Sequence, residues 1–144
     1  MSDALFGMIL KVHQAIYEAT GGFLGHRLIG VPTLLLRTTG RKTGKTRTAA
    51  LVYAKDGDSF IVVGSKGGAD TSPGWFFNAK ANPDVEIQLG RRHSPAKAEA
   101  IEKGDADYDR LWTLTNKNNG NRYNAYQRKT ARPIPLLRLT PISA

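Results

Sequence analysis

Residues 33–54 read Thr-Leu-Leu-Leu-Arg-Thr-Thr-Gly-Arg-Lys-Thr-Gly-Lys-Thr-Arg-Thr-Ala-Ala-Leu-Val-Tyr-Ala, and their pattern decides the fold. The outer runs, 33–38 and 47–54, are rich in apolar and β-branched residues, which favour extended strands. The stretch between them, 38–47, holds glycines, threonines and basic residues, which are typical of turns. The sequence therefore predicts two strands joined by a hairpin tip or a crossover loop.

The stretch 38–47 also predicts an anion-binding site. Glycines free backbone amides to converge on an anion, and basic side chains add positive charge. The basic residues are Arg41, Lys42, Lys45 and Arg47. A nucleotide-binding P-loop is disfavoured, because Thr39 stands where that motif requires its first glycine and a strand follows Thr46 in place of a helix. A solvated basic turn that binds no ligand remains the alternative.

The rest of the chain predicts a small, mainly β domain of the α+β class. The predicted strands span 33–39, 47–55, 59–65, 85–89, 94–102 and 134–139, with a hairpin turn at 56–58. Short helices are predicted at 106–116, at 123–130 and at 72–79, the last with Ser72 as N-cap and Pro73 at its first position. Six antiparallel strands with helices on the rim predict a small barrel, whose closure removes exposed sheet edges.

Residues 1–30 form a predicted N-terminal unit, an amphipathic helix and its connector, ahead of the barrel domain at 31–144. Its apolar residues recur at steps of three and four: Leu5, Met8, Ile9, Val12, Ile16 and Ala19. We expect this helix to pack on the core, or else to contact a membrane surface or an apolar substrate. The sequence shows no export signal, so the expected location is cytoplasmic, with peripheral contact at the inner face of the membrane as an alternative.

Composition narrows the classes of function. The 144-residue chain has no cysteine, which excludes disulfides, thiolate catalysis and cysteine-ligated zinc. His13, His26 and His93 have no metal-ligand spacing, so no metal site is predicted. The net charge of +9 attracts polyanions, but no helix-turn-helix, zinc-finger or RNA-binding aromatic motif accompanies it. A basic nucleic-acid-binding barrel remains an alternative to the favoured partner, an anionic coenzyme.

A second candidate site lies at the end of the predicted strand 59–65. There Val63-Gly64-Ser65-Lys66-Gly67-Gly68 combines a hydroxyl, an ammonium and glycines that let the backbone approach a ligand closely. The following residues, 70–75, lead into a helix N-terminus, which is itself an anion-binding element. A loop shaped only by turn sterics is the alternative. Trp75, Phe76 and Phe77 cannot share one helix face, so at least one ring is expected to be exposed or to line a pocket.

Tyr123 and Tyr126 are three residues apart and therefore share one face of the predicted helix 123–130. Paired phenols over a pocket can donate a proton or hydrogen-bond a carbonyl, and otherwise they are packing residues.

The sequence has no nucleophile elbow of the kind that serves triad hydrolases. The sequence thus predicts an anion-binding site with aromatic residues around it, but no strong base or nucleophile. This combination is typical of an enzyme in which a bound coenzyme carries out the difficult chemistry.

The chain resembles the deazaflavin-dependent nitroreductase family of mycobacteria and related actinobacteria. The resemblance spans 31–140 and rests on five collinear stretches: Leu-Arg-Thr-Thr-Gly-Arg-Lys-Thr-Gly-Lys-Thr-Arg (36–47), Val-Gly-Ser-Lys-Gly-Gly (63–68), Pro-Gly-Trp-Phe-Phe-Asn (73–78), Ala-Asn-Pro-Asp-Val (81–85) and Tyr-Gln-Arg-Lys-Thr-Ala-Arg-Pro-Ile-Pro (126–135). It implies a split β-barrel that binds reduced coenzyme F-420, an 8-hydroxy-5-deazaflavin, and passes its hydride to a quinone, a conjugated enone or a nitro-type acceptor. FMN is the less favoured cofactor, because it ends in a single phosphate, whereas F-420 carries a phosphodiester and a chain of glutamates.

The resemblance also implies roles for individual residues in cofactor binding. The polyanionic tail of F-420 would be tracked by Arg41, Lys42, Lys45 and Arg47. The coenzyme would contact Ser65 and Lys66, and Gly67 and Gly68 would allow its close approach. Trp75 would pack near the ring system or the tail, and Asn78 would help to fix the helix.

On the substrate side, Tyr123 and Tyr126 match the tyrosines of the family's C-terminal helix, and one of them would stabilise the developing oxyanion. Gly120 stands where the best-studied pattern has a further tyrosine, which favours quinones and enones over nitro compounds. A carrier that binds F-420 or FMN without a substrate of its own is the remaining alternative.

Overall fold

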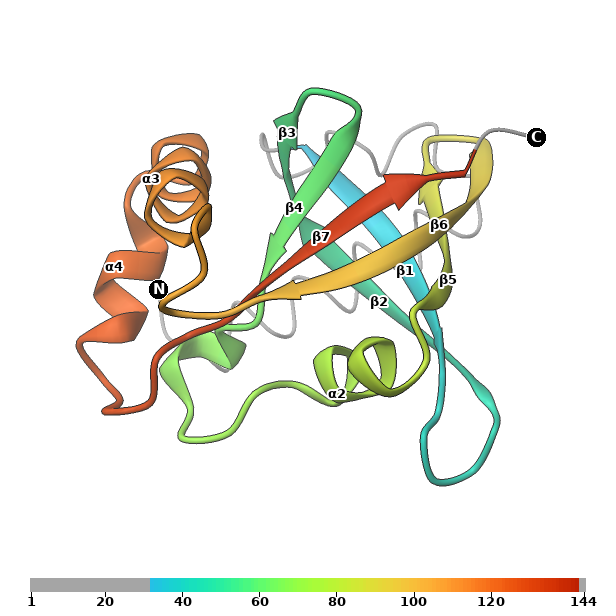
Figure 1. Ribbon diagram of the computed structural model, residues 1–144, viewed down its shortest axis with the longest axis horizontal. Coiled ribbons are helices and arrows are strands. Elements are labelled where there is room, and N and C mark those ends of the chain that lie inside the picture. The colour runs from blue at the N-terminus through green and yellow to red at the C-terminus, as the bar shows by residue number, and fades with distance from the viewer. Residues whose placement is uncertain (1–31, 143–144) are drawn as a thin grey trace.

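The computed structural model describes residues 32–142, which form one curled antiparallel sheet accompanied by short helices (Figure 1). The strands are β1 (Thr33–Thr39), β2 (Thr46–Val52), β3 (Ala54–Asp56), β4 (Ser59–Val63), β5 (Asp84–Leu89), β6 (Arg92–Ile101) and β7 (Leu136–Pro141). The helices are α2 (Gly74–Ala81), α3 (Tyr108–Asn118), α4 (Arg122–Gln127) and the short 3-10 turn η2 (Lys66–Gly68). The predicted N-terminal helix and its proposed membrane contact lie outside the described residues.

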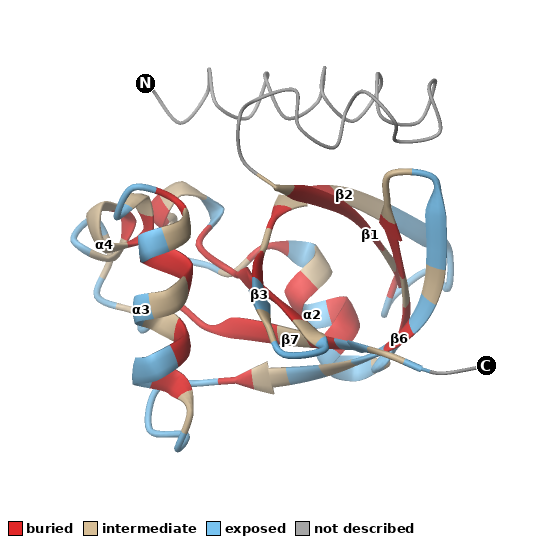
Figure 2. Ribbon diagram, turned by 90° about the horizontal axis from the view of Figure 1, so that it is seen from above, coloured by how far each residue is buried: buried red, intermediate tan, exposed pale blue. Residues whose placement is uncertain are grey.

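The order of strands in the sheet is β2-β1-β5-β6-β7-β4-β3. The two outermost strands, β2 and β3, are therefore neighbours in the sequence, separated only by Tyr53. A sheet whose opposite edges are joined by one residue has to curl back on itself, and the strands accordingly wrap around a central core (Figure 2). The mainly β, antiparallel barrel-like architecture predicted from the sequence is confirmed.

The structure corrects the predicted strand count from six to seven. The single strand expected at 47–55 is interrupted at Tyr53, because the backbone groups of this residue bond outside the ladder. Its amide donates to the carbonyl of Pro32 (3.1 Å), and its carbonyl accepts from the Asn118 side chain (2.7 Å). These contacts separate β2 from β3 and let the two strands end the sheet on opposite sides.

Several predicted element boundaries are also corrected: the helices predicted at 106–116 and 123–130 span Tyr108–Asn118 and Arg122–Gln127. Helix α2 begins at Gly74 with Pro73 at its N-cap and has no side-chain cap, so Ser72 lies one residue before the N-cap, where its hydroxyl accepts a hydrogen bond from Arg132 (3.0 Å). The last strand begins at Leu136, two residues later than predicted. The amide of Ile134 donates to the side chain of Gln127 (2.9 Å), and proline at 135 has no amide with which to extend the ladder.

Two large apolar clusters hold the described fold together, and a small third one joins Leu35 of β1 to Ala50 of β2. Inside the curled sheet, alternate strand residues such as Leu34, Leu36 and Leu139 pack with Phe76 of α2, which contributes its buried face. The second cluster lies where α3 and α4 cover the sheet, and it contains Ile61, Val63, Ile101, Tyr108, Leu111, Tyr123, Tyr126, Ile134 and Leu136. In Figure 2, α2 lies within the curl of the sheet and α3 and α4 stand together at one side. These placements bring the β1–β2 tip next to α2.

Candidate functional site

The basic stretch is the tip of the hairpin formed by β1 and β2. The register pairs Thr39 with Thr46, and the amides of Gly40 and Gly44 close the loop by donating to Lys45 O and Gly40 O, each at 2.8 Å. Gly44 has φ +72°, a conformation that favours glycine. A Cβ atom at Gly40 would lie only 2.8 Å from the Thr43 hydroxyl oxygen. The prediction of a hairpin tip is thus confirmed over that of a crossover loop. The geometry of the turn explains why glycine stands at positions 40 and 44.

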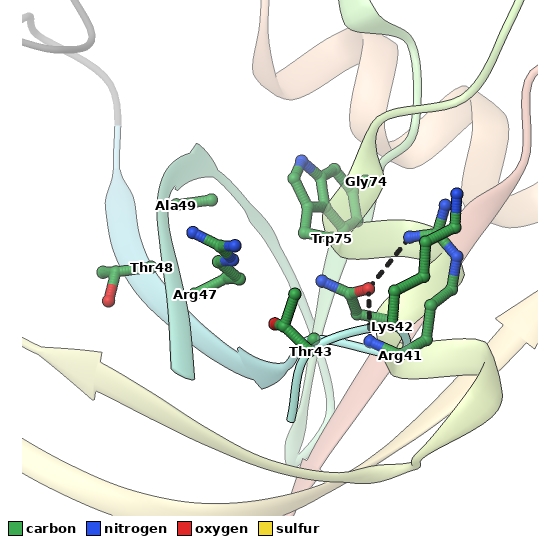
Figure 3. A pocket seen from close by; sticks show the side chains of 10 residues that line it. Arg41, Lys42, Thr43, Arg47, Thr48, Ala49, Gly74 and Trp75 are labelled. Carbon is green, nitrogen blue, oxygen red and sulfur yellow. Dashed lines mark hydrogen bonds between the residues drawn. The ribbon is translucent and has the colours of Figure 1, made fainter. Parts of the chain in front are cut away.

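Asn78 of α2 anchors this tip. Its side-chain oxygen accepts hydrogen bonds from the Arg41 backbone amide (3.1 Å) and from the Arg41 guanidinium (3.0 Å), as the dashed lines in Figure 3 show. Its side-chain nitrogen donates to the Thr38 hydroxyl (3.3 Å), so both the oxygen and the nitrogen of this buried amide form hydrogen bonds. The Arg41 guanidinium also lies over the Phe77 ring, 5.1 Å from the centroid. Two neighbouring residues of α2 therefore fix the direction of Arg41.

The tip, the start of β2 and the N-terminal turn of α2 enclose a pocket of about 380 Å³ (Figure 3). It is lined by Gly40, Arg41, Lys42, Thr43, Arg47, Thr48, Ala49, Gly74, Trp75 and Asn78. Lys45 is exposed on the same tip but does not line the pocket. Trp75 is the only aromatic ring in this lining, while Phe76 is buried and Phe77 exposed, so the prediction that the three rings would diverge is confirmed.

The tip carries positive charge that the rest of the described chain does not neutralise. No ion pair within residues 32–142 includes Arg41, Lys42, Lys45 or Arg47. Elsewhere basic side chains do pair, as Arg37 does with Glu86 (3.3 Å) and Arg138 with Glu99 (2.8 Å). A pocket that combines unpaired cations with backbone amides and one aromatic wall can bind an anionic ligand.

The second predicted site, at 63–68, has a different surrounding. Ser65 is buried, Lys66 is exposed, and none of the residues 65–68 lines the pocket at the tip. Lys66, Gly67 and Gly68 all have positive φ, at 46°, 66° and 88°. A Cβ atom at Gly68 would lie 2.7 Å from the carbonyl oxygen of Tyr126, so the missing side chain makes room for α4. Cofactor contact by these residues stays a prediction.

Tyr123 and Tyr126 are both buried in the cluster beneath α3 and α4 and lie outside the lining of the pocket at the tip. Their ring centroids are 6.3 Å apart in an edge-to-face arrangement. Burial raises the pKa of Tyr123 far above its usual value, although a hydrogen bond to Asn119 opposes the shift, so its phenol stays protonated. Both rings pack in the core, and their role toward a substrate stays a prediction. Gly120 is exposed, at φ +60°, in the turn between α3 and α4.

Sequence reasoning gave no role to Arg132, which the structure places at the centre of the second site. Its guanidinium bonds to Gly64, Ser65, Ala69 and Ser72, all more than fifty positions earlier in the chain. The residue stands within the stretch 126–135 that carries the family resemblance, but nothing in the sequence separates it from Arg128 nearby.

The described residues give two further results. No group of three or more histidine, aspartate or glutamate side chains in the part of the chain that the structure describes could hold a metal ion. Among the same residues, no helix has the length and apolar character needed to cross a membrane.

Comparison with known proteins gives consistent matches over most of the chain. The family model for F420H2-dependent quinone reductases matches residues 9–141. The F420H2-dependent quinone reductase Rv1261c of Mycobacterium tuberculosis is 52% identical over 133 residues, covering 92% of this chain and 89% of that protein. Among solved structures, the F420H2-dependent reductase FDR-A of Mycobacterium smegmatis has a TM-score of 0.67 at 36% identity, covering 75% of this chain and 93% of its own. A structure described as a domain-swapped dimer has a TM-score of 0.70 at 32% identity, covering 93% and 98%.

Proposed function

This chain belongs to the F420H2-dependent quinone reductase family, and from that premise we propose that it reduces a quinone with F420H2, the reduced form of coenzyme F-420. The relative from Mycobacterium tuberculosis and the solved reductase FDR-A support the same class of oxidoreductase. The observation that carries the site assignment is the hairpin tip, where cations without an ion pair among the described residues line or adjoin a pocket, and where Asn78 anchors Arg41.

The residues at the tip fit the cofactor by charge and by shape. F-420 ends in a phosphodiester and several glutamates, so it needs several cations along an exposed path. Lys42 and Arg47 line the pocket, and Lys45 extends the basic surface beyond it. Because none of them is paired with a carboxylate of the described chain, binding an anion there breaks no existing ion pair. FMN, with one phosphate, would use only part of this surface.

We assign cofactor binding to two elements on the basis of this fit. At the tip, the cations and the Trp75 ring hold the anionic part of the cofactor, and Asn78 acts through Arg41. At η2, the buried Ser65 and exposed Lys66, with Gly67 and Gly68, form the second contact. The structure gives Gly68 a packing role as well, because α4 occupies the space in which a side chain at position 68 would lie.

When bound, F420H2 supplies a hydride to an electron-poor acceptor. For a quinone, addition of one hydride and one proton gives the hydroquinone, so the protein has to stabilise a developing oxyanion and allow a proton to reach it. A neutral phenol of Tyr123 or Tyr126 would donate a hydrogen bond to that oxygen. Positioning of cofactor and acceptor would supply most of the rate, and a well-placed phenol would add roughly 100- to 10,000-fold.

Acceptors other than quinones follow from the same chemistry. Conjugated enones also accept hydride at carbon and develop negative charge on oxygen, so we propose them as alternative substrates. Nitro compounds are less favoured because Gly120 offers no side chain in the turn before α4. Apolar quinones partition into membranes, and peripheral contact of the N-terminal helix with the inner face of the membrane stays a prediction about residues 1–30.

The test is a fluorescence titration of the full chain with F-420 and, in parallel, with FMN, followed by turnover of menadione with F420H2. We expect saturable binding of F-420, weaker or absent binding of FMN, and oxidation of F420H2 that depends on menadione. Binding without turnover would instead indicate a carrier. Tight FMN binding with no affinity for F-420 would contradict the proposal, and a steep salt-dependent affinity for DNA alone would favour the nucleic-acid alternative.

A further inference from the structure

The side chain of Arg132 ties together a loop that is distant from it in the sequence. Its Nε donates to the carbonyl of Ala69 (2.7 Å) and one terminal nitrogen donates to the Ser72 hydroxyl (3.0 Å). The other terminal nitrogen donates to the carbonyls of Gly64 (3.2 Å) and Ser65 (2.9 Å). One guanidinium therefore serves four acceptors along residues 64–72, the segment that we call the η2 loop.

The η2 loop needs such a partner because its backbone is irregular. Three successive residues, Lys66 to Gly68, have positive φ, and Lys66 at 46° is not a glycine. Glycine adopts positive φ readily, so the strained residue is Lys66, and such a residue persists where surrounding contacts determine its conformation. The backbone hydrogen bonds inside the loop join residues only three positions apart: Gly68 N donates to Ser65 O (2.9 Å), and Ala69 N donates to Lys66 O (3.2 Å). Removing the guanidinium would take from the carbonyls of Gly64 and Ala69 the hydrogen bonds that they accept from Arg132, while Ser65 O would keep the bond from Gly68 N.

Arg132 is suited to this task by its geometry. Its planar fork presents five N–H donors in fixed directions, whereas a lysine ammonium would reach fewer of the four acceptors at once. All four acceptors are uncharged, so the guanidinium is not held by a direct ion pair to any of them. Nearby, Asp70 accepts a hydrogen bond from the Thr130 hydroxyl (3.1 Å), which adds a second link between the loop and the segment after α4.

We propose that Arg132 is a positioning residue for the cofactor: it holds the η2 loop in the conformation in which Ser65 and Lys66 meet F-420. The inference rests on the proposed function, because it assumes that this loop contacts the cofactor. Arg132 itself bonds to the loop and acts through it. The loop also packs on α4, where a Cβ atom at Gly68 would lie 2.7 Å from the Tyr126 carbonyl oxygen, so the loop that Arg132 holds lies next to the helix of the proposed substrate-side tyrosines.

The experiment compares Arg132→Lys with Arg138→Lys in the full chain. Arg138 is a matched control, since its guanidinium bonds to Glu99 and Asp107 (2.8 Å each) and has no contact with the η2 loop. Two quantities are measured: the dissociation constant for F-420 by fluorescence, and amide hydrogen exchange of the peptide 63–72 without cofactor. For Arg132→Lys we expect affinity about tenfold weaker and exchange of this peptide about tenfold faster, whereas Arg138→Lys should change neither.

The possible outcomes separate this inference from the proposed function. Wild-type affinity and exchange in a folded Arg132→Lys variant would overturn the inference. Faster exchange with unchanged affinity would also overturn it, because the loop would then be held by Arg132 without shaping the cofactor site, while the proposed function would stand. A wild-type chain that does not bind F-420 would contradict the proposed function itself, and with it the cofactor role of Arg132.

A milder variant decides the question if Arg132→Lys does not fold. Ser72→Ala removes one of the four acceptors and leaves the three carbonyl bonds. Its control is Ser59→Ala, which removes a hydroxyl bonded to Thr140 (2.8 Å) at the other end of the sheet. We expect Ser72→Ala to accelerate exchange of the peptide 63–72 and to weaken F-420 binding by about twofold to fivefold relative to Ser59→Ala. Identical values in the two variants would overturn the inference.

Discussion

The side-chain oxygen of Asn78 accepts two hydrogen bonds from Arg41, one from its backbone amide at 3.1 Å and one from its guanidinium at 3.0 Å. The two residues are 37 positions apart, and the contact joins α2 to the tip of the β1–β2 hairpin. Because Asn78 is buried and also bonds to Thr38, the tip is held from inside the fold. The cations of the tip are therefore presented on a fixed scaffold, which lowers the entropy lost when an anion binds.

Replacing Asn78 should test this scaffold. Asn78→Ala leaves the Arg41 amide without its partner, and we expect a loss of about 1–3 kcal/mol in the free energy of unfolding. Asn78→Asp keeps an acceptor for Arg41 but places a negative charge beside the pocket. In a fluorescence titration at low salt, Asn78→Asp should therefore bind F-420 more weakly than Asn78→Ala does, and added salt should narrow the difference. Equal affinities at low salt would contradict an anion site here.

The cations of the tip should differ in importance. Lys42 and Arg47 line the pocket and Lys45 does not, so Lys42→Ala and Arg47→Ala should each weaken F-420 binding more than Lys45→Ala. The expected loss is about 1–3 kcal/mol for each charged hydrogen bond. Lys103→Ala, on an exposed turn, is the charge-matched control and should leave the affinity unchanged. An equal effect of all four substitutions would indicate general charge attraction in place of a defined site.

The contact between Gly68 and α4 predicts a specific loss of stability. Gly68→Ala places a Cβ atom 2.7 Å from the Tyr126 carbonyl oxygen and 3.0 Å from the Lys129 Cβ. Gly104→Ala is the control, since Gly104 also has positive φ, at 103°, but has no atom within 4 Å of an added Cβ. Both variants carry backbone strain, so thermal unfolding should show Gly68→Ala to be less stable by an additional amount of about 1–3 kcal/mol. Matching unfolding curves would contradict the packing role.

Substitutions of the two tyrosines of α4 should distinguish a catalytic role from a packing role. Tyr123→Phe and Tyr126→Phe each remove a hydroxyl and keep the ring in the core. If one phenol bonds the developing oxyanion, turnover of menadione in that variant should fall about tenfold or more, and the affinity for F-420 should hold. The measurement is steady-state kinetics beside the fluorescence titration. Wild-type turnover in both single variants and in the double variant would show that these residues serve packing alone.

Alkaline pH should weaken the fold through a third buried tyrosine. Burial raises the pKa of Tyr108 to about 12, and its hydroxyl donates to the carbonyl of Ile134. The unfolded chain loses this proton near pH 10, whereas the folded chain keeps it until about pH 12. Between these values the unfolded state binds fewer protons, so stability falls as pH rises, by at most about 1.4 kcal/mol per pH unit for one group.

The comparison that isolates this effect is Tyr108→Phe. Urea unfolding of wild type and variant at several pH values from 9 to 12 should give a shallower decline for the variant, because one of the titrating phenols is gone. The variant should also be less stable near pH 7, where it lacks the bond to Ile134. Parallel declines in the two proteins would show that Tyr108 does not contribute.

The sequence by itself determined the local elements of this protein. The polar stretch between two apolar β-branched runs predicted two strands joined by a hairpin tip or a crossover loop, and the structure shows the hairpin, whose turn requires the glycines at 40 and 44. Strand and helix positions followed from the period of apolar residues, and five collinear motifs carried the family. Each of these features depends on residues that are close together in the chain, so their physical causes can be seen in a short window.

Only the tertiary structure decided which distant groups bond to each other. Tyr53 ends a strand because its backbone groups bond to Pro32 and Asn118, and the Ser72 hydroxyl, predicted to cap α2, instead accepts a hydrogen bond from Arg132. The hydrogen-bond partners of the Asn78 side-chain oxygen and nitrogen are likewise determined by the packing of the hairpin against α2. A side chain can satisfy its hydrogen bonds in many ways in the unfolded chain, and the curl of the sheet leaves only one set of partners within reach.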